Sequence, residues 1–136
     1  MIYHGQQIYA RNVILATTLF ARMRGLLGRK SLGAETAMVI APCSSIHTLG
    51  MKFPIDVVFL DSKNKITAIA CAVKPGRFWV SGGWSCRRVI ESEAGCLDLS
   101  RLHIGDALDI LPHKAWSVGK RSASATGTIT YRKTKG

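Results

Sequence analysis

Short runs of apolar and β-branched residues, broken by Gly, Pro, Asn or Asp, recur along the first 111 residues of this chain. Runs of this length are typical of β-strands, and breaks of this kind are typical of turns. A hairpin turn is predicted at residues 61–65 and a second turn at residues 74–76. The pattern predicts strands at residues 7–10, 13–16, 37–40, 55–60, 66–73, 87–91 and 107–111.

One stretch follows helical spacing instead. From Thr18 to about Leu27 the apolar positions fall on one face of a predicted helix, with Thr17 or Thr18 as its N-cap and Gly28 just past its end. A parallel α/β fold would require a helical pattern between successive strands, and the sequence lacks such patterns. The chain is therefore predicted to be mainly β, an antiparallel sandwich or barrel with one or two short helices.

Composition divides the chain at Pro112. A length of 136 residues suits one hydrophobic core, and we predict a single β-rich domain over residues 1–111. Residues 112–136 are rich in Ser, Thr, Gly and Lys and are predicted to form a flexible tail. The net charge is +11, and the tail holds six basic and no acidic residues. We interpret it as a solvated segment, or alternatively as a source of non-specific attraction to nucleic acid or an anionic membrane.

No transmembrane segment or secretory signal is predicted. Apolar runs fall short of the roughly 20 residues that cross a bilayer, and the first residues lack a basic start and apolar core. The predicted location is the cytoplasm, where cysteines remain thiols. The four cysteines lack zinc-ligand spacing, and Cys71, inside an apolar run, is expected to fill the core.

The densest group of reactive side chains precedes and enters the strand at residues 55–60: Cys43, His47, Met51 and Asp56 lie within fourteen residues. His47 could hold a loop through backbone hydrogen bonds, or serve as acid, base or ligand. Cys43 is either an inert thiol or a reactive thiolate paired with His47. Met51 is interpreted as core or rim packing.

Asp56 interrupts an apolar strand. Alternation places it opposite Val57 and Phe59, on a surface where it could line a groove. Arg24 and Arg29 are candidate partners for its carboxylate. We favour a structural Arg–Asp tie, with an anion site built on the arginines as the alternative.

Two further features complete the candidates. Phe78, Trp79 and Trp84 flank a glycine pair and are expected to pack inward as a lid, with an exposed stacking surface as the alternative. Cys43, His47 and Met51 together offer the thiolate, imidazole and thioether donors of a blue-copper loop. That loop joins the last two strands of copper proteins, whereas this segment is mid-domain, so no cofactor is predicted.

Three segments in order resemble the uncharacterised family DUF192, also called UPF0127. These are Arg24–Arg29, the run from His47 to Asp61, and Glu91 with Ala94–Gly95 followed by Ile104–Asp106. The resemblance covers about residues 10–111. It implies a compact β-sandwich of jelly-roll type and implies no activity, because the family has none established.

The sequence thus favours a non-enzymatic accessory module that binds a small ligand or a protein partner. Its predicted groove runs beside His47 and Asp56, with Arg24, Met51, Trp79 and Trp84 around it. One alternative is a thiol enzyme or hydrolase in which Cys43 is the nucleophile, His47 the base and Asp56 the orienting carboxylate. Others are metal binding at Cys43, His47 and Met51, and a scaffold bound through the basic tail.

Overall fold

A computed structural model describes residues 1–16 and 28–111 of the chain, and these residues form ten strands. In chain order they are β1 (Ile2–His4), β2 (Gln7–Ala10), β3 (Asn12–Ala16), β4 (Thr36–Ile40), β5 (Ser45–Ile46), β6 (Ile55–Leu60), β7 (Ile66–Val73), β8 (Val80–Ser81), β9 (Arg88–Glu93) and β10 (Asp109–Ile110). The predicted helix near residues 18–27 and the basic tail lie outside the described residues. Within them, no helix is long and apolar enough to cross a membrane.

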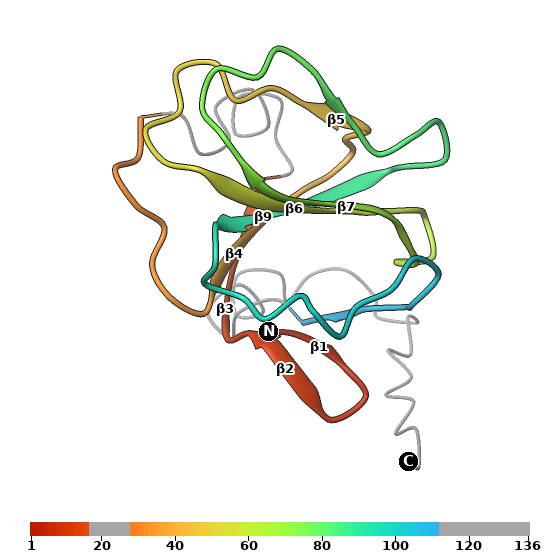
Figure 1. Ribbon diagram of the computed structural model, residues 1–136. Helices are drawn as coiled ribbons and strands as arrows, with labels where there is room; N and C mark the ends of the chain where they lie inside the picture. Colours follow the sequence, from red (N-terminus) through yellow and green to blue (C-terminus); the bar gives the residue numbers. More distant parts are fainter. Residues whose placement is uncertain (17–27, 112–136) are drawn as a thin grey trace, which may run out of the picture.

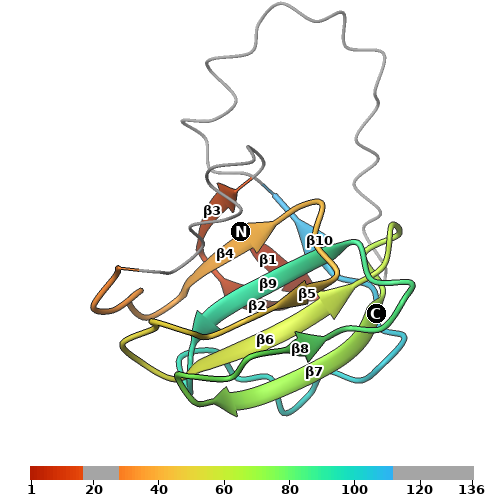
Figure 2. The same ribbon diagram turned by 90° about the horizontal axis from the view of Figure 1, so that it is seen from above.

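The strands form three layers (Figure 1). A central five-stranded sheet has the order β3-β4-β9-β6-β7, and a three-stranded sheet, β10-β1-β2, lies against one of its faces. The opposite face carries a two-stranded ribbon made of β5 and β8, seen from above in Figure 2. We call it the β5–β8 ribbon. The fold is mainly β and sandwich-like, as predicted, and it is an open sandwich rather than a closed barrel.

Most predicted strands are confirmed. The observed β2, β6 and β7 have the predicted bounds, and β3 and β4 each begin one residue earlier than predicted. β9 begins one residue later and ends two residues later than predicted, and β10 covers only two of the five residues predicted at 107–111. β1, β5 and β8 were not predicted, because strands of two or three residues carry too little alternation to recognise. The hairpin between β6 and β7 is also confirmed, with Asp61 accepting hydrogen bonds from the backbone N–H groups of Lys63 and Lys65 at 2.8 and 3.0 Å.

One pairing departs from the predicted antiparallel arrangement. β3 and β4 run parallel, with Asn12 opposite Thr36 and Ala16 opposite Ile40. A parallel pair needs a crossover of about a dozen residues or more, and residues 17–35 are long enough to provide one. The central sheet is therefore mixed.

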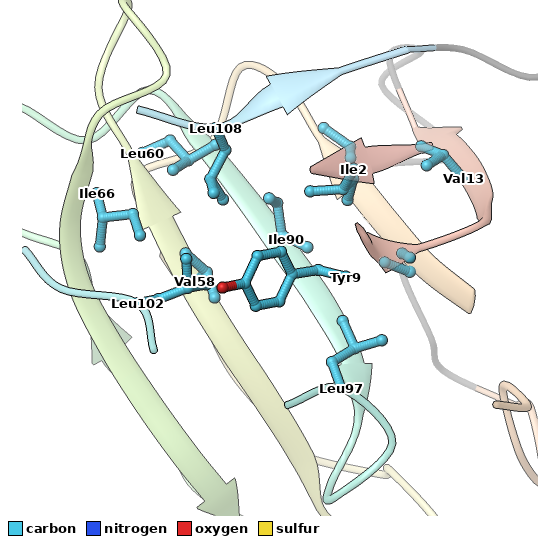
Figure 3. Packing of buried hydrophobic residues seen from close by; sticks show 13 residues of the cluster. Ile2, Tyr9, Val13, Val58, Leu60, Ile66, Ile90, Leu97, Leu102 and Leu108 are labelled. Atoms are coloured by element: carbon cyan, nitrogen blue, oxygen red, sulfur yellow. The ribbon is translucent and has the colours of Figure 1, made fainter. Parts of the chain in front are cut away.

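Two apolar clusters occupy the two faces of the central sheet. The first lies against the three-stranded sheet, where Tyr9 packs among Val58, Ile90 and Leu97 (Figure 3). The second lies under the β5–β8 ribbon and includes Phe59. Because both faces are covered, every residue of β6 is buried. The interior of the central sheet is therefore closed to solvent at β6, while the ribbon and the edge strand β7 have exposed residues.

Candidate ligand-binding site

The β5–β8 ribbon has an inner face against the sheet and an outer face toward solvent. Ile46 pairs with Val80, and both pack onto the second apolar cluster. Ser45 pairs with Ser81, and strand alternation turns these two outward. His47 and Trp79 follow one residue beyond the paired positions, and both are exposed. The ribbon thus presents an imidazole and an indole on the same outer face.

A buried threonine fixes the turn that leads into β8. The Thr48 hydroxyl donates to the Lys74 carbonyl at 2.7 Å and accepts from the Arg77 N–H at 2.8 Å. Its backbone N–H also donates to the Arg77 carbonyl, and its carbonyl accepts from the Gly76 N–H. These four hydrogen bonds of Thr48 fix the backbone at Lys74 and Arg77, and therefore the positions from which the two side chains extend.

The other end of the ribbon lies close to the sheet because Gly82 has no side chain. A Cβ at this position would lie 2.4 Å from atoms of the Phe59 side chain. The Thr67 hydroxyl on β7 donates to the Gly82 carbonyl at 2.9 Å. The ribbon is therefore held to the sheet at both ends.

The aromatic residues around β8 point away from the core. Phe78, Trp79 and Trp84 are 79%, 67% and 91% exposed. The expected inward lid is wrong, because the cluster beneath the ribbon is already covered by smaller residues such as Ile46 and Met51. The alternative interpretation, an exposed stacking surface, describes these side chains.

A cavity of about 460 Å³ lies between the second half of β7 and β8. Residues of both polarities line it: Ala70, Cys71, Ala72, Val73, Lys74, Arg77 and Val80. Ala70, Val73 and Val80 also pack against the apolar cluster and give the cavity an apolar floor. Lys74 and Arg77 are exposed and supply positive charge.

The charge at this cavity is uncompensated by acidic neighbours along the chain. Residues 62–90 contain six basic and no acidic residues. Among the described residues, ion pairs form at Arg11–Glu35 and His103–Asp106, and neither involves the cavity. Lys74 and Arg77 are thus available to an anionic group.

Cys71 corrects a sequence prediction. It was expected in the core, but it is exposed and lines the cavity. β7 is an edge strand with an irregular register between Ile55 and Val57 of its partner, and Ala72 there has a positive φ of 52°. Burial, and then the Asp56 charge, raise the pKa of the Cys71 thiol, so it stays protonated at neutral pH.

Asp56 is also placed differently from its prediction, since it is only 5% exposed. Its carboxylate accepts hydrogen bonds from the backbone N–H groups of Ala72 at 2.7 Å and Gly95 at 3.0 Å. Alternation gives it the sheet face of Val58 and Leu60, away from the ribbon. It therefore lines no groove with His47. Arg24 lies outside the described residues, and Arg29 is exposed.

The remaining predicted site residues are not brought together either. His47 is exposed, whereas Met51 is buried in the second cluster, and Cys43 packs against that cluster and donates through Sγ to the Ser45 carbonyl. The extended strand β5 separates Cys43 from His47. In residues 1–16 and 28–111 no three His, Cys, Asp or Glu side chains are grouped to hold a metal ion. A smaller cavity of about 220 Å³ adjoins Cys43, Cys86 and Arg87.

Glu91 was noted in the sequence only as part of the family resemblance. It is 5% exposed and lies between Met38 and Val57 in the central sheet. No described residue forms a hydrogen bond or ion pair with its carboxylate, and burial raises its pKa from 4.5 to about 7. The signal in the sequence is a carboxylate two residues after Val89, where alternation requires an apolar side chain. Lys74 and Arg77 were missed because a turn with two cations usually indicates only a solvated loop.

Comparisons with known proteins agree with the geometry at the level of fold. The sequence model of the uncharacterised family DUF192 matches residues 2–110. A UPF0127 protein of Thermococcus sibiricus is 31% identical over 107 residues, which are 76% of this chain and 68% of that protein.

Two crystal structures are similar. One is a protein of unknown function from Novosphingobium aromaticivorans, with a TM-score of 0.64 and 22% identity over 72% of this chain and 74% of that one. The other is described as a putative transcription regulator from Sinorhizobium meliloti, with a TM-score of 0.63 and 21% identity over 71% and 79%. At these identities the likeness establishes the fold alone.

Proposed function

This chain belongs to the uncharacterised family DUF192, and we propose that it is a small-ligand-binding module rather than an enzyme. The ligand would occupy the cavity between β7 and β8. The observation that carries this proposal is the composition of that cavity: an apolar floor, and beside it two cations that form no ion pair within residues 1–16 and 28–111. Its volume of about 460 Å³ falls in the range of roughly 300–1,000 Å³ that is typical of small-molecule sites.

The cavity lining defines the class of ligand. Ala70, Val73 and Val80 favour an apolar body, while Lys74 and Arg77 favour a carboxylate, phosphate or sulfonate at one end. Thr48 holds the turn that carries both cations, so the site is largely formed before a ligand binds. The ligand-binding site proposed here lies under the same ribbon whose outer face carries His47 and Trp79.

The arrangement of the three candidate catalytic residues favours binding over catalysis. A Cys–His–Asp mechanism needs the thiol, the imidazole and the carboxylate in contact with one another. Asp56 is engaged by two backbone N–H groups on the opposite face of the sheet from the ribbon. The four free cysteines would suit a cytoplasmic setting, which we include in the proposal.

The proposal is tested with a pair of fluorescent probes. 8-Anilinonaphthalene-1-sulfonate has an apolar body and one anionic group, and N-phenyl-1-naphthylamine has a similar body without charge. We expect the double variant Lys74→Gln/Arg77→Gln to lose about tenfold in affinity for the sulfonate, because two partly solvated charge contacts disappear. Its affinity for the neutral amine should stay unchanged.

The matched control is Lys63→Gln/Lys65→Gln, which removes the same charge from the hairpin between β6 and β7, at the far end of β7. This control should bind the sulfonate like the natural chain. Equal losses in both double variants would mean that overall charge, and not the cavity, attracts the probe, and would refute the proposal. An unchanged affinity in the cavity variant would refute it as well.

A further inference from the structure

Exposed aromatic residues lie on and beside the outer face of the β5–β8 ribbon, and the proposed ligand cavity does not use them. Trp79 and Trp84 expose most of their side chains, and Trp84 follows the ribbon by three residues. Their positions are five residues apart, so their Cα atoms are at most about 18 Å from each other. A linear polymer that carries planar groups could therefore stack one such group on each ring.

The Trp84 ring is presented by an ordered turn. The Arg87 guanidinium donates through Nη1 to the Trp84 carbonyl at 2.8 Å and to the Cys86 carbonyl at 2.9 Å. The Cys86 N–H closes the turn on the Gly83 carbonyl. The same guanidinium remains exposed, so a positive charge accompanies the ring.

Charge along the ribbon has a single sign. Basic side chains precede and follow the aromatic residues, and acidic ones are absent from residues 62–90. Such a surface complements a polyanion whose charges repeat along its length. Of the six basic residues in this range, Lys74, Arg77 and Arg87 are near the ribbon in the chain, whereas Lys63 and Lys65 lie in the hairpin between β6 and β7 and Arg88 lies on β9.

The polar residues of the outer face favour one of two possible polyanionic partners, an anionic bilayer or a nucleic acid. Inserting the tryptophan rings into the apolar layer of a bilayer would bring the hydroxyls of Ser45 and Ser81 and the His47 ring toward hydrocarbon, where lost hydrogen bonds to water are costly. Nucleobase edges can hydrogen-bond to these groups, and His, Phe and Trp all stack on bases. Aromatic rings with flanking cations on an extended surface are the means by which proteins bind single strands.

We propose that the outer face of the β5–β8 ribbon binds single-stranded nucleic acid without sequence preference, through base stacking on Trp79 and Trp84 and phosphate contacts from Arg77 and Arg87. Duplexes bind less tightly, because their base faces are stacked internally. This site shares Arg77 with the proposed small-ligand cavity, but its stacking residues Trp79 and Trp84 do not line that cavity.

The test is fluorescence anisotropy of a labelled twelve-residue oligothymidylate with the full chain. We expect Trp79→Ala and Trp84→Ala each to weaken binding by about tenfold, because one stacked base is lost in each. Trp79→Phe should keep most of the affinity. The control Ile104→Ala removes an exposed apolar side chain from another loop and should leave binding unchanged. Thermal melting of each variant verifies that it is folded.

Three results would overturn the proposal. In the first, the tryptophan variants bind the oligonucleotide as the natural chain does, so that electrostatic attraction alone holds it. In the second, the duplex of the same length binds as tightly as the single strand. In the third, the oligonucleotide does not bind, while vesicles of phosphatidylserine and phosphatidylcholine bind in a manner that depends on both tryptophans.

Discussion

Glu91 shows how one residue can oppose the stability of the sheet that contains it. Its carboxylate is buried beside apolar neighbours, and no described residue pairs with it. Burial favours the neutral form and raises its pKa from 4.5 to about 7. In the unfolded chain the group ionises near its ordinary value. Between these two pKa values the folded state therefore binds more protons than the unfolded state.

The sign of the effect on stability follows directly. The free energy of unfolding should fall as pH rises from about 4.5 to 7 and then level off, with a total loss of about 3 kcal/mol. Glu91→Gln cannot ionise, so it should be more stable than the natural chain at pH 8 and differ less at pH 4.5. Urea unfolding at several pH values measures this difference.

The matched control is Glu35→Gln, since Glu35 is exposed and pairs with Arg11 at the surface. That variant should show little pH-dependent difference from the natural chain. If the difference in unfolding free energy between Glu91→Gln and the natural chain did not change with pH, the account of Glu91 as a buried, unpaired carboxylate would be wrong.

At the scale of elements, the irregular register of β7 shapes the proposed ligand cavity. Cys71 and Ala72 lie at this irregularity and also line the cavity. The Asp56 carboxylate holds this irregular segment by accepting a hydrogen bond from the Ala72 N–H. It holds the turn after β9 by accepting a second hydrogen bond from the Gly95 N–H. One buried carboxylate on β6 therefore holds both β7, which forms one wall of the cavity, and the turn after β9.

We expect Asp56→Asn to lower the free energy of unfolding by about 1–3 kcal/mol, because the amide cannot accept both N–H groups and leaves one buried donor without a partner. Urea denaturation measures the loss. The variant should also bind 8-anilinonaphthalene-1-sulfonate less tightly, as the cavity wall is no longer fixed. Asp109→Asn, at an exposed carboxylate on β10, is the control and should change neither quantity. If the free energy of unfolding of Asp56→Asn equalled that of the natural chain, the prediction would be wrong and the two hydrogen bonds would not stabilise the fold.

At the scale of the whole molecule, the sequence predicts the strands better than it predicts what covers them. Alternation correctly sets Asp56 opposite Val57 and Phe59, yet the residue is buried, because β6 lies inside the sheet with both faces covered. Cys71 is exposed for the converse reason, since β7 is an edge strand. The position of a strand within its sheet depends on long-range pairing, which a local pattern does not contain.

The residues that line the proposed ligand cavity were not among the predicted site residues, and the reason is again long-range pairing. His47 and Trp79, 32 positions apart in the sequence, meet on one face only because the two-residue strands β5 and β8 pair. Strands this short give no detectable period. Lys74 and Arg77 become a feature of the cavity only once Thr48 has fixed their turn.

The most direct test of the proposed ligand cavity is amide chemical-shift mapping of the ¹⁵N-labelled full chain during titration with 8-anilinonaphthalene-1-sulfonate. The proposal predicts that the largest shifts occur at residues 70–74, at Arg77 and at Val80, and that they saturate with a single affinity. Shifts confined to the hairpin at residues 61–65, or spread evenly over exposed residues without saturation, would contradict a ligand site between β7 and β8.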